Sequence, residues 1–277
     1  MSHYYDSFPW YLRAENEKQY LYIARHKENS PQLRDWSPEE IDYEMSFSKN
    51  ASKLEIGHFT QNALEYFVEH YGKNYEHLYF NNATRIRDFS PLADLPNLIS
   101  VSINWCRADK LWDMSNNKHL KNICIDTAKK MTYELSMIET CKSLENIMII
   151  GNIDTPHTLK TLSCFNGLPN LRRIDLLDIK LENNDISFLD TLPCFEEFHF
   201  EPGMLTTEGI AYICAKFPNL RGRSLCAFTE HHNSMNDVRV CGKRKPSLDL
   251  PKQQKLLDKY ILEFNNLVEK YKEELNT

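Results

Sequence analysis

The amino-acid sequence predicts an α/β solenoid: a parallel β-sheet on the concave face, helices and turns on the convex face, and helical caps at both ends. Three observations predict this fold. An apolar frame recurs through the middle of the chain, a fixed tetrapeptide precedes several copies of it, and the composition is that of a globular protein. The 277 residues are 42% hydrophobic and 26% charged, with 8 Gly and 12 Pro. This composition argues against a low-complexity or disordered chain.

The repeated frame has apolar residues at its first, fourth and sixth positions. Six copies begin 22 to 27 residues apart, at Tyr75, Leu98, Leu120, Leu144, Leu171 and Phe195. A weaker copy, Ala51-Leu54-Ile56, precedes them, and a degenerate one begins at Leu220. The alternation within each frame makes a short strand with one buried face, which a single repeat cannot bury alone. We therefore expect the strands to pair side by side, while the rest of each repeat returns as a helix or turn.

A tetrapeptide directly before several frames indicates that they are true repeats. It reads Leu-Pro-Asn-Leu at residues 95–98 and 168–171, and related tetrapeptides occupy residues 192–195 and 217–220. With these residues the sequence resembles the leucine-rich repeat family, and residues 86–98 resemble the internalin-type subclass of bacterial repeats. The resemblance implies a repeat architecture for about residues 51–228. Where the family usually has Asn or Cys, only Cys106 and Asn152 match, and the other repeats have Ala83, Ala128, Ile179 and Gly203.

The segments around the strands are predicted to form return helices and caps. Residues 60–71 and 206–216 show the apolar spacing of return helices. Residues 1–50 form the expected N-terminal cap, with one helix near residues 10–26 and a second that begins with the capping box Ser37-Pro38-Glu39-Glu40. Residues 229–277 form the expected C-terminal cap, with an edge strand at 238–240 and a long amphipathic helix over 252–275. That helix covers the last repeat, pairs two chains or binds a partner, so both a monomer and a homodimer stay open.

Residues that alternate with the buried apolar positions are expected to point to the open face of the sheet. The candidate partner-binding residues on and beside this face are Tyr79, Trp105, Asp126, Met148, Ile150, Arg173, Asp175, Leu177, Asp178, Glu197, His199 and Glu201. Met148, Ile150 and Leu177 are expected to be exposed, unless a cap or loop covers them, and Trp105 lies either at the rim or in the core. Carboxylates make the C-terminal half of the face acidic. An apolar centre beside charges is typical of a protein-binding patch.

Charge and motifs narrow the classes of function. The formal net charge of −6 provides no overall positive field for nucleic acid. The N-terminus does not resemble a secretory signal and no apolar run is long enough for a membrane span, so we expect a cytoplasmic location and no membrane partner. Walker, GxGxxG, HExxH and GxSxG motifs are absent from the sequence. We therefore predict no catalytic residue, cofactor or metal, and reduced structural cysteines.

The leading hypothesis is a non-catalytic intracellular bacterial module that binds one protein partner on its concave face. Its acidic surface favours a basic partner, and a narrower form of the hypothesis is an immunity or antitoxin-like inhibitor of a basic toxin. Two alternatives stay open. One is a metal-dependent enzyme with a site near Cys226, His231, His232 and Cys241. The other is a structural homodimer joined through the C-terminal helix.

Overall fold

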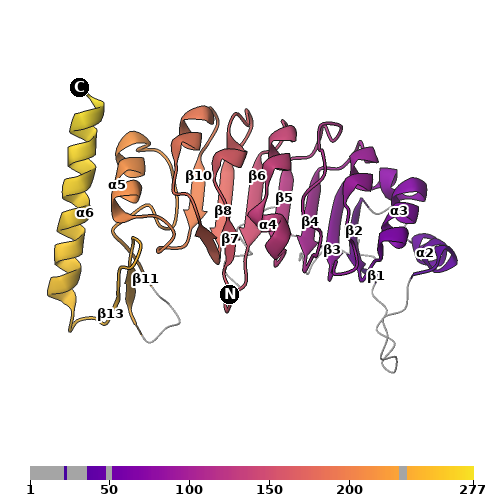
Figure 1. The fold of residues 1–277 in the computed structure, drawn as a ribbon, viewed down its shortest axis with the longest axis horizontal. Coiled ribbons are helices and arrows are strands. Elements are labelled where there is room, and N and C mark those ends of the chain that lie inside the picture. Colours follow the sequence, from indigo (N-terminus) through magenta and orange to yellow (C-terminus); the bar gives the residue numbers. More distant parts are fainter. Residues whose placement is uncertain (1–21, 24–35, 48–51, 231–235) are drawn as a thin grey trace.

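The main feature of the protein is one parallel sheet that runs the length of the repeat array (Figure 1). The computed structural model describes residues 22–23, 36–47, 52–230 and 236–277. Eight strands follow in the order β1-β2-β3-β4-β5-β6-β8-β10, and every neighbouring pair is parallel. Their bounds are Tyr22–Ile23, Lys53–Gly57, His77–Asn81, Ser100–Asn104, Asn122–Asp126, Asn146–Ile150, Arg173–Leu177 and Glu197–Phe200.

The register of the sheet confirms the predicted frames. The fourth position of each frame pairs with the same position in the next, from Leu78↔Val101 to Ile174↔Phe198. These side chains are fully buried, and each large apolar group removed from water contributes about 1.5–3 kcal/mol. The weak upstream frame is also a strand, β2, with Leu54 and Ile56 buried. The architecture is thus consistent with a leucine-rich repeat solenoid.

In two of its four copies the recurring tetrapeptide ties its repeat to the one before it. The Asn97 side-chain amide donates to the Lys73 carbonyl, and the Asn170 amide donates to the Lys142 carbonyl, both at 2.9 Å. The flanking residues Leu95 and Leu98 are buried in the core. Asparagine therefore recurs because it pairs a backbone carbonyl that the neighbouring repeat leaves available.

The chain leaves several strands through a residue with left-handed backbone geometry. The φ angles are 57° at His58, 54° at Asn82, 50° at Trp105, 53° at Thr127 and 52° at Asp178. Asn and Asp tolerate this conformation, whereas a bulky or β-branched residue is strained in it. The sheet holds the turns in place: the amides of Trp105 and Thr127 donate to carbonyls of the next strand at 2.9 Å.

Return segments on the other side of the strands complete the core. The two predicted return helices are confirmed as α3 (Gln61–His70) and α5 (Thr207–Lys216), each capped by the preceding threonine. The other returns are shorter: η1 (Gly72–Asn74), η2 (Ser90–Asp94), α4 (Lys129–Tyr133), η3 (Ser136–Thr140), η4 (Ser163–Phe165) and η5 (Ser187–Thr191). Beside them, β7 (His157–Leu159) and β9 (Ile179–Leu181) form a parallel pair. Apolar side chains of these returns join those of the strands in one cluster.

The N-terminal end contains one confirmed helix and one wrong prediction. In α2 (Pro38–Met45) the Ser37 hydroxyl accepts from the Glu40 amide at 3.3 Å, and Glu40 accepts from the Ser37 amide at 3.1 Å, as the capping box predicts. The helix expected near residues 10–26 is wrong at Tyr22–Ile23, which form β1. Pairing with β2 satisfies backbone hydrogen-bonding groups at the sheet edge. Helix propensity is a local property of the sequence and does not include this long-range pairing. The rest of that predicted helix lies outside the described residues.

The C-terminal end is a small antiparallel sheet followed by a long helix. Strands β11 (Phe228–Glu230), β12 (Val238–Val240) and β13 (Ser247–Leu248) pair with β12 in the middle, so the prediction that residues 238–240 form an edge strand is wrong. β12 is not at the edge because β13 pairs with its free side, and β13 is too short to give a recognisable pattern in the sequence.

The long helix α6 (Gln254–Leu275) packs against α5. The rings of Tyr212 and Tyr271 meet edge to face at 5.5 Å, and Leu257 and Phe264 are buried. The helix therefore covers the last repeat within its own chain, and the pairing of two chains stays a prediction. Among the described helices, none combines the length and hydrophobicity that a membrane crossing requires.

Candidate functional site

The predicted apolar centre of the concave face is buried. Met148 is 0% exposed, and Ile150 and Leu177 are also buried, so the prediction of exposed apolar anchors at these positions is wrong. In the register of the sheet, Met148 lies between Cys124 and Asp175, which are themselves buried. Ladder neighbours of this kind pack against one another across the strands. The accessible part of the candidate surface therefore lies on either side of this centre.

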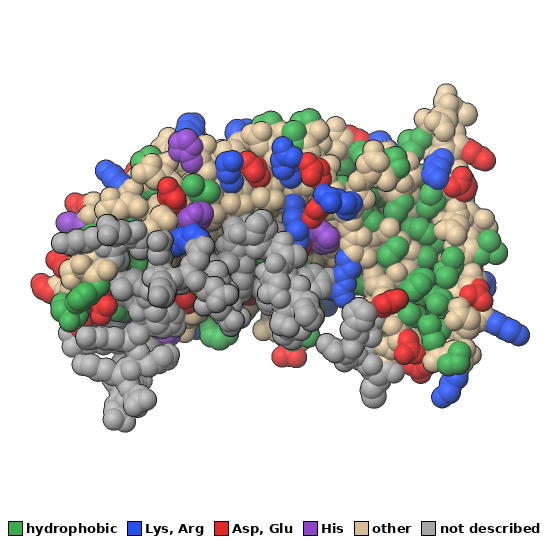
Figure 2. Space-filling view, turned by 180° about the vertical axis from the view of Figure 1, so that it is seen from behind, with side chains coloured by type: hydrophobic (Ala, Val, Ile, Leu, Met, Phe, Trp, Pro, Cys, Tyr) green, Lys and Arg blue, Asp and Glu red, His purple; other side chains and the backbone are tan. Residues whose placement is uncertain are grey.

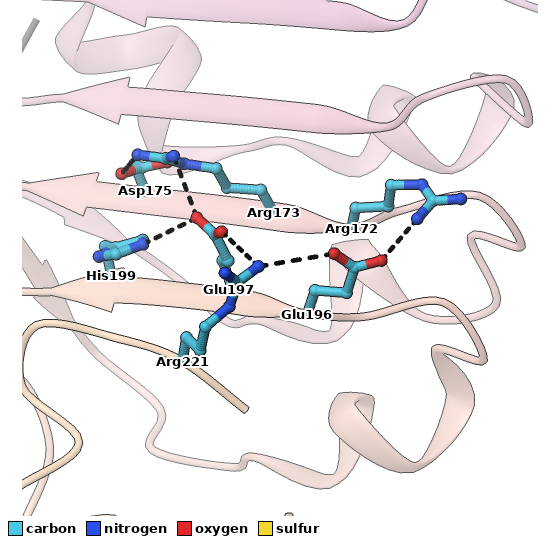
Figure 3. A network of polar contacts seen from close by, with 7 residues as sticks. All are labelled: Arg172, Arg173, Asp175, Glu196, Glu197, His199 and Arg221. Atoms are coloured by element: carbon cyan, nitrogen blue, oxygen red, sulfur yellow. Dashed lines mark hydrogen bonds and ion pairs between the residues drawn. The ribbon is translucent and has the colours of Figure 1, made fainter. Parts of the chain in front are cut away.

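A network of ion pairs occupies the C-terminal half of the concave face (Figure 3). Arg173 binds the buried Asp175 through two hydrogen bonds, Nε–Oδ2 at 2.6 Å and Nη2–Oδ1 at 3.0 Å. A further nitrogen of Arg173, Nη1, lies 3.0 Å from Glu197 Oε2, and Arg221 Nη2 lies 2.8 Å from Glu197 Oε1. The two-point contact offsets part of the cost of burying Asp175, because a guanidinium matches a carboxylate in geometry as well as charge.

The network balances its own charge. Glu196 extends it to Arg172 at 2.5 Å and to Arg221 at 3.7 Å, so three arginines face the three carboxylates Asp175, Glu196 and Glu197. The prediction that the C-terminal half of the face is acidic is therefore wrong for this part of the surface. Sequence reasoning missed Arg221 because the frame that begins at Leu220 is degenerate. A parallel bridge between Glu197 and Arg221 shows that the ladder continues there.

Glu197 and His199 form the polar centre of the network. His199 Nε2 lies 3.2 Å from Glu197 Oε2. Burial is the largest single influence on Glu197 and raises its pKa, but the hydrogen bond to His199 and the charges of Arg173 and Arg221 outweigh it, so the pKa is lowered overall. Glu197 is therefore an anion held in place by its neighbours, able to accept a hydrogen bond from a partner.

The remaining predicted carboxylates lie where strands end. Asp126 accepts hydrogen bonds from Asn104 and Thr127, both at 2.7 Å. Burial raises the pKa of Asp178, although His157 acts in the opposite direction. Burial also raises the pKa of Glu201, against the effect of Arg223 and with that of Asp178. These last two carboxyl groups are poorly compensated, and each favours the protonated form more than an ordinary carboxyl does.

The raised pKa of Glu201 makes stability depend on pH in a definite direction. A carboxyl group whose pKa is higher in the folded state contributes stability that is fully present below its unfolded pKa and is lost as pH rises through the folded pKa. We expect Glu201→Gln to unfold at a higher temperature than the unsubstituted protein at pH 7. The difference should close below about pH 4, where both side chains are neutral.

Circular dichroism melts at the two pH values measure this effect. Glu69→Gln, at an exposed position of α3, is the matched control and should leave the melting temperature unchanged. A lower melting temperature for Glu201→Gln at pH 7 would instead show that Arg223 stabilises the ionised carboxylate.

The other predicted side chains divide between accessible and partly buried positions. Trp105 is 52% exposed at the edge where the strands end, which places it at the rim rather than in the core. Tyr79 on β3 is partly buried. Two further large apolar groups are exposed in the repeats after Trp105, namely Tyr133 at the end of α4 and Ile153 after β6. Exposed hydrophobic groups thus occur in three successive repeats, after β4, β5 and β6.

A broad hydrophobic area lies at the C-terminal end of the face seen in Figure 2. Figure 2 shows hydrophobic side chains gathered there beside α6, whereas charged groups of both signs are mixed along the rest of the visible face. The C-terminal patch, as we name this area, consists of partly exposed side chains of the last repeat and α6: Leu220, Leu225, Ala227, Phe228, Tyr260, Ile261, Leu267 and Val268. The sequence pattern favoured a cap for α6 and left partner binding by this helix open, but it did not predict which residues of the stripe stay partly exposed.

The predicted metal alternative finds no support in the described part of the chain. Within residues 22–23, 36–47, 52–230 and 236–277, no group of three or more His, Cys, Asp or Glu side chains is placed to hold a metal ion. His231 and His232 lie outside the described residues. His157 is a buried histidine whose Nδ1 has no hydrogen-bond partner in the structure. Burial, the largest cause, and Lys129 lower the pKa of His157, which favours a neutral ring.

Comparisons with known proteins add little to this picture. No family model matches the chain, and no curated protein matches it significantly. A solved structure of an internalin (inlF) from Listeria monocytogenes is similar over 61% of this chain, with 13% identity and a TM-score of 0.34. The similarity covers 64% of that chain, less than two thirds of its length. The strand order and register described above, and not this weak similarity, establish the repeat array.

Proposed function

We propose that this protein is a non-catalytic binding module that engages one protein partner along its concave face, inside a bacterial cell. The observation that carries the proposal is the C-terminal patch, because partly exposed apolar groups gathered beside polar ones mark a protein-binding surface. Arg221 of the ion-pair network lies in the chain between Leu220 and Leu225 of the patch. Fixed hydrogen-bonding groups and apolar groups thus both come from the last repeat.

The dimensions of the face suit one partner of ordinary size. Strands β4 and β10 are four sheet positions apart, which corresponds to about 19 Å at the usual spacing between strands. A standard interface buries about 800 Å² on each protein, enough to extend from the rim at Trp105 to the C-terminal patch. Trp105 supports this extent, because an exposed tryptophan at the rim is the type of side chain that anchors protein interfaces.

The chemistry of the partner follows from the balanced network. Arginines neutralise the carboxylates, so the surface selects for matched hydrogen bonds more than for a strongly basic protein. Inhibition of a basic toxin stays a prediction that rests on the overall charge of the chain.

Charged substitutions in the patch test the proposal. Val268→Asp introduces a carboxylate among partly exposed apolar groups, and we expect it to weaken binding at least ~30-fold, or about 2 kcal/mol, as for a residue central to an interface. Affinity capture with quantitative mass spectrometry identifies proteins that the unsubstituted chain retains and the variant loses. Titration calorimetry with the purified partner then gives the two dissociation constants.

Leu262→Asp is the matched control. Leu262 lies on the same helix and is 61% exposed, and its spacing from Phe264 places it on the opposite face. This variant should bind as the unsubstituted protein does. Equal binding by all three proteins, or the absence of any protein that Val268→Asp loses selectively, would refute the proposal.

A further inference from the structure

Two cysteines meet where the repeat array joins the small C-terminal sheet. Strands β11 and β12 pair with Phe228 opposite Val240, and the Cys241 amide extends the ladder by donating to the Ala227 carbonyl at 2.9 Å. Cys226, one residue before Ala227, is therefore displaced by one position from Cys241 across an antiparallel pair. Such a displacement corresponds to about 6 Å between Cα atoms, within the range that a disulfide spans.

The two thiols also act on each other. Cys241 lowers the pKa of Cys226, and Cys226 raises the pKa of Cys241. The Cys226 thiol further lies 3.0 Å from the Phe228 carbonyl oxygen and 3.4 Å from the Arg223 carbonyl oxygen. Cys226 is partly exposed, whereas Cys241 is 0% exposed. The pair thus combines a partly exposed thiol with a buried thiol.

The two thiols differ in acidity in the direction that oxidation requires. The hydrogen bond with Cys241 lowers the pKa of Cys226 against the opposing effect of burial. By contrast, burial raises the pKa of Cys106 and Cys141 to about 11 by decreasing the stability of the thiolate, and it also raises the pKa values of Cys124, Cys164 and Cys214. A thiolate is the nucleophile in thiol oxidation, so Cys226 should react first.

We propose that Cys226 and Cys241 are a redox-sensitive pair that hydrogen peroxide converts to a reversible disulfide. The Cys226 thiolate attacks one peroxide oxygen, which forms an S–O bond, breaks the O–O bond and releases hydroxide, which takes up a proton to become water. The Cys241 sulfur then attacks the Cys226 sulfenic acid. An S–S bond forms, the S–O bond breaks, and the hydroxyl group leaves as water with the Cys241 proton. Two thiols are oxidised and one peroxide is reduced to two waters.

The position of the pair gives the modification a structural effect. Cys226 lies between Leu225 and Ala227 of the C-terminal patch, and Cys241 directly follows β12. A bond between them fixes the end of the last repeat to the small sheet. The disulfide itself does not depend on the proposed binding function, because its formation is measured without a partner.

Peroxide treatment of the full-length protein, followed by alkylation of remaining thiols and peptide mapping, tests the proposal. We expect a linked peptide pair containing Cys226 and Cys241, the loss of two hydrogen atoms per chain, and full reversal by dithiothreitol. In Cys241→Ser the disulfide should be absent, and dimedone should trap a sulfenic acid on Cys226. In Cys226→Ser neither product should form.

Cys194 provides the matched control, since it is also partly exposed. We expect Cys194→Ser to form the disulfide normally, and Cys226 to be oxidised at least ~10-fold faster than Cys194 in the unsubstituted protein. A linkage of Cys226 to Cys214 instead of Cys241, or equal oxidation of Cys226 and Cys194, would overturn the proposal. The proposal would also be overturned if both thiols stay reduced after peroxide treatment while circular dichroism shows that the protein is folded.

Discussion

Asn117→Asp should lower the free energy of unfolding by about 4 kcal/mol, the expected cost of a buried charge without a partner. Asn117 is 1% exposed and connects three groups. Its amide nitrogen donates to the Leu92 carbonyl at 2.9 Å and the Leu95 carbonyl at 3.0 Å, and its oxygen accepts from the Trp112 indole at 2.8 Å. A carboxylate at this position still accepts the hydrogen bond from the Trp112 indole, but its second, negatively charged oxygen faces the two carbonyl oxygens.

Urea unfolding followed by circular dichroism measures this cost, and Asn117→Leu provides the comparison. Leucine leaves the indole N–H without its partner, but both carbonyls still accept from backbone amides of Leu95 and Leu98. Its cost should be about 2 kcal/mol, the penalty of one unpaired buried donor. Equal losses in the two variants would show that the amide nitrogen of Asn117 contributes nothing to stability.

The same residue shows what the repeat pattern can and cannot predict. The position three residues before the frame holds a buried leucine in three repeats, Leu95, Leu168 and Leu192, and Asn117 stands there in the repeat that begins at Leu120. The exception is visible in the sequence. Its partners are not, because two of them belong to the preceding repeat and become neighbours only when the array stacks.

For the candidate site, alternation along the strands predicts on which face of the sheet a side chain lies, but not whether that side chain is exposed. It places Met148, Asp175 and Glu197 correctly on alternate positions of parallel strands. The burial of Met148 is a property of the surrounding structure, which period-two alternation does not contain. By contrast, the pairing of Arg173 with Asp175 follows from the pattern, because residues two apart on a strand share a face.

The hydrophobic surface at the C-terminal end could be predicted only in part. The stripe on α6 is readable from its three-and-four spacing, and the helix forms as expected. How much of the stripe α5 covers depends on the packing angle between the two helices. Leu257 and Phe264 are buried, whereas Leu267 and Val268 stay partly exposed, although all four belong to the same stripe.

Phe198→Ala should cost about 3–5 kcal/mol, the range measured when a buried aromatic side chain is truncated. Phe198 lies on β10 beneath the ion-pair network and is fully buried. Its ring centroid is 5.8 Å from that of Phe188, 6.1 Å from Phe195 and 4.7 Å from Phe200. Removing it leaves a cavity among three rings and also loses their edge and tilted contacts.

The damage should stay local, because each repeat contacts mainly its neighbours. We expect hydrogen exchange in Phe198→Ala to accelerate in β8, β10 and α5, with little change in β2 and β3. Phe80→Ala is the reciprocal variant: Phe80 is buried on β3 and packs on Phe89 at 5.5 Å. In Phe80→Ala, hydrogen exchange should accelerate in the N-terminal repeats and change little in β10. Equal acceleration of hydrogen exchange along the whole sheet in both variants would mean that the array unfolds as one unit. The interaction free energy between repeats would then exceed the local loss of stability that either substitution causes.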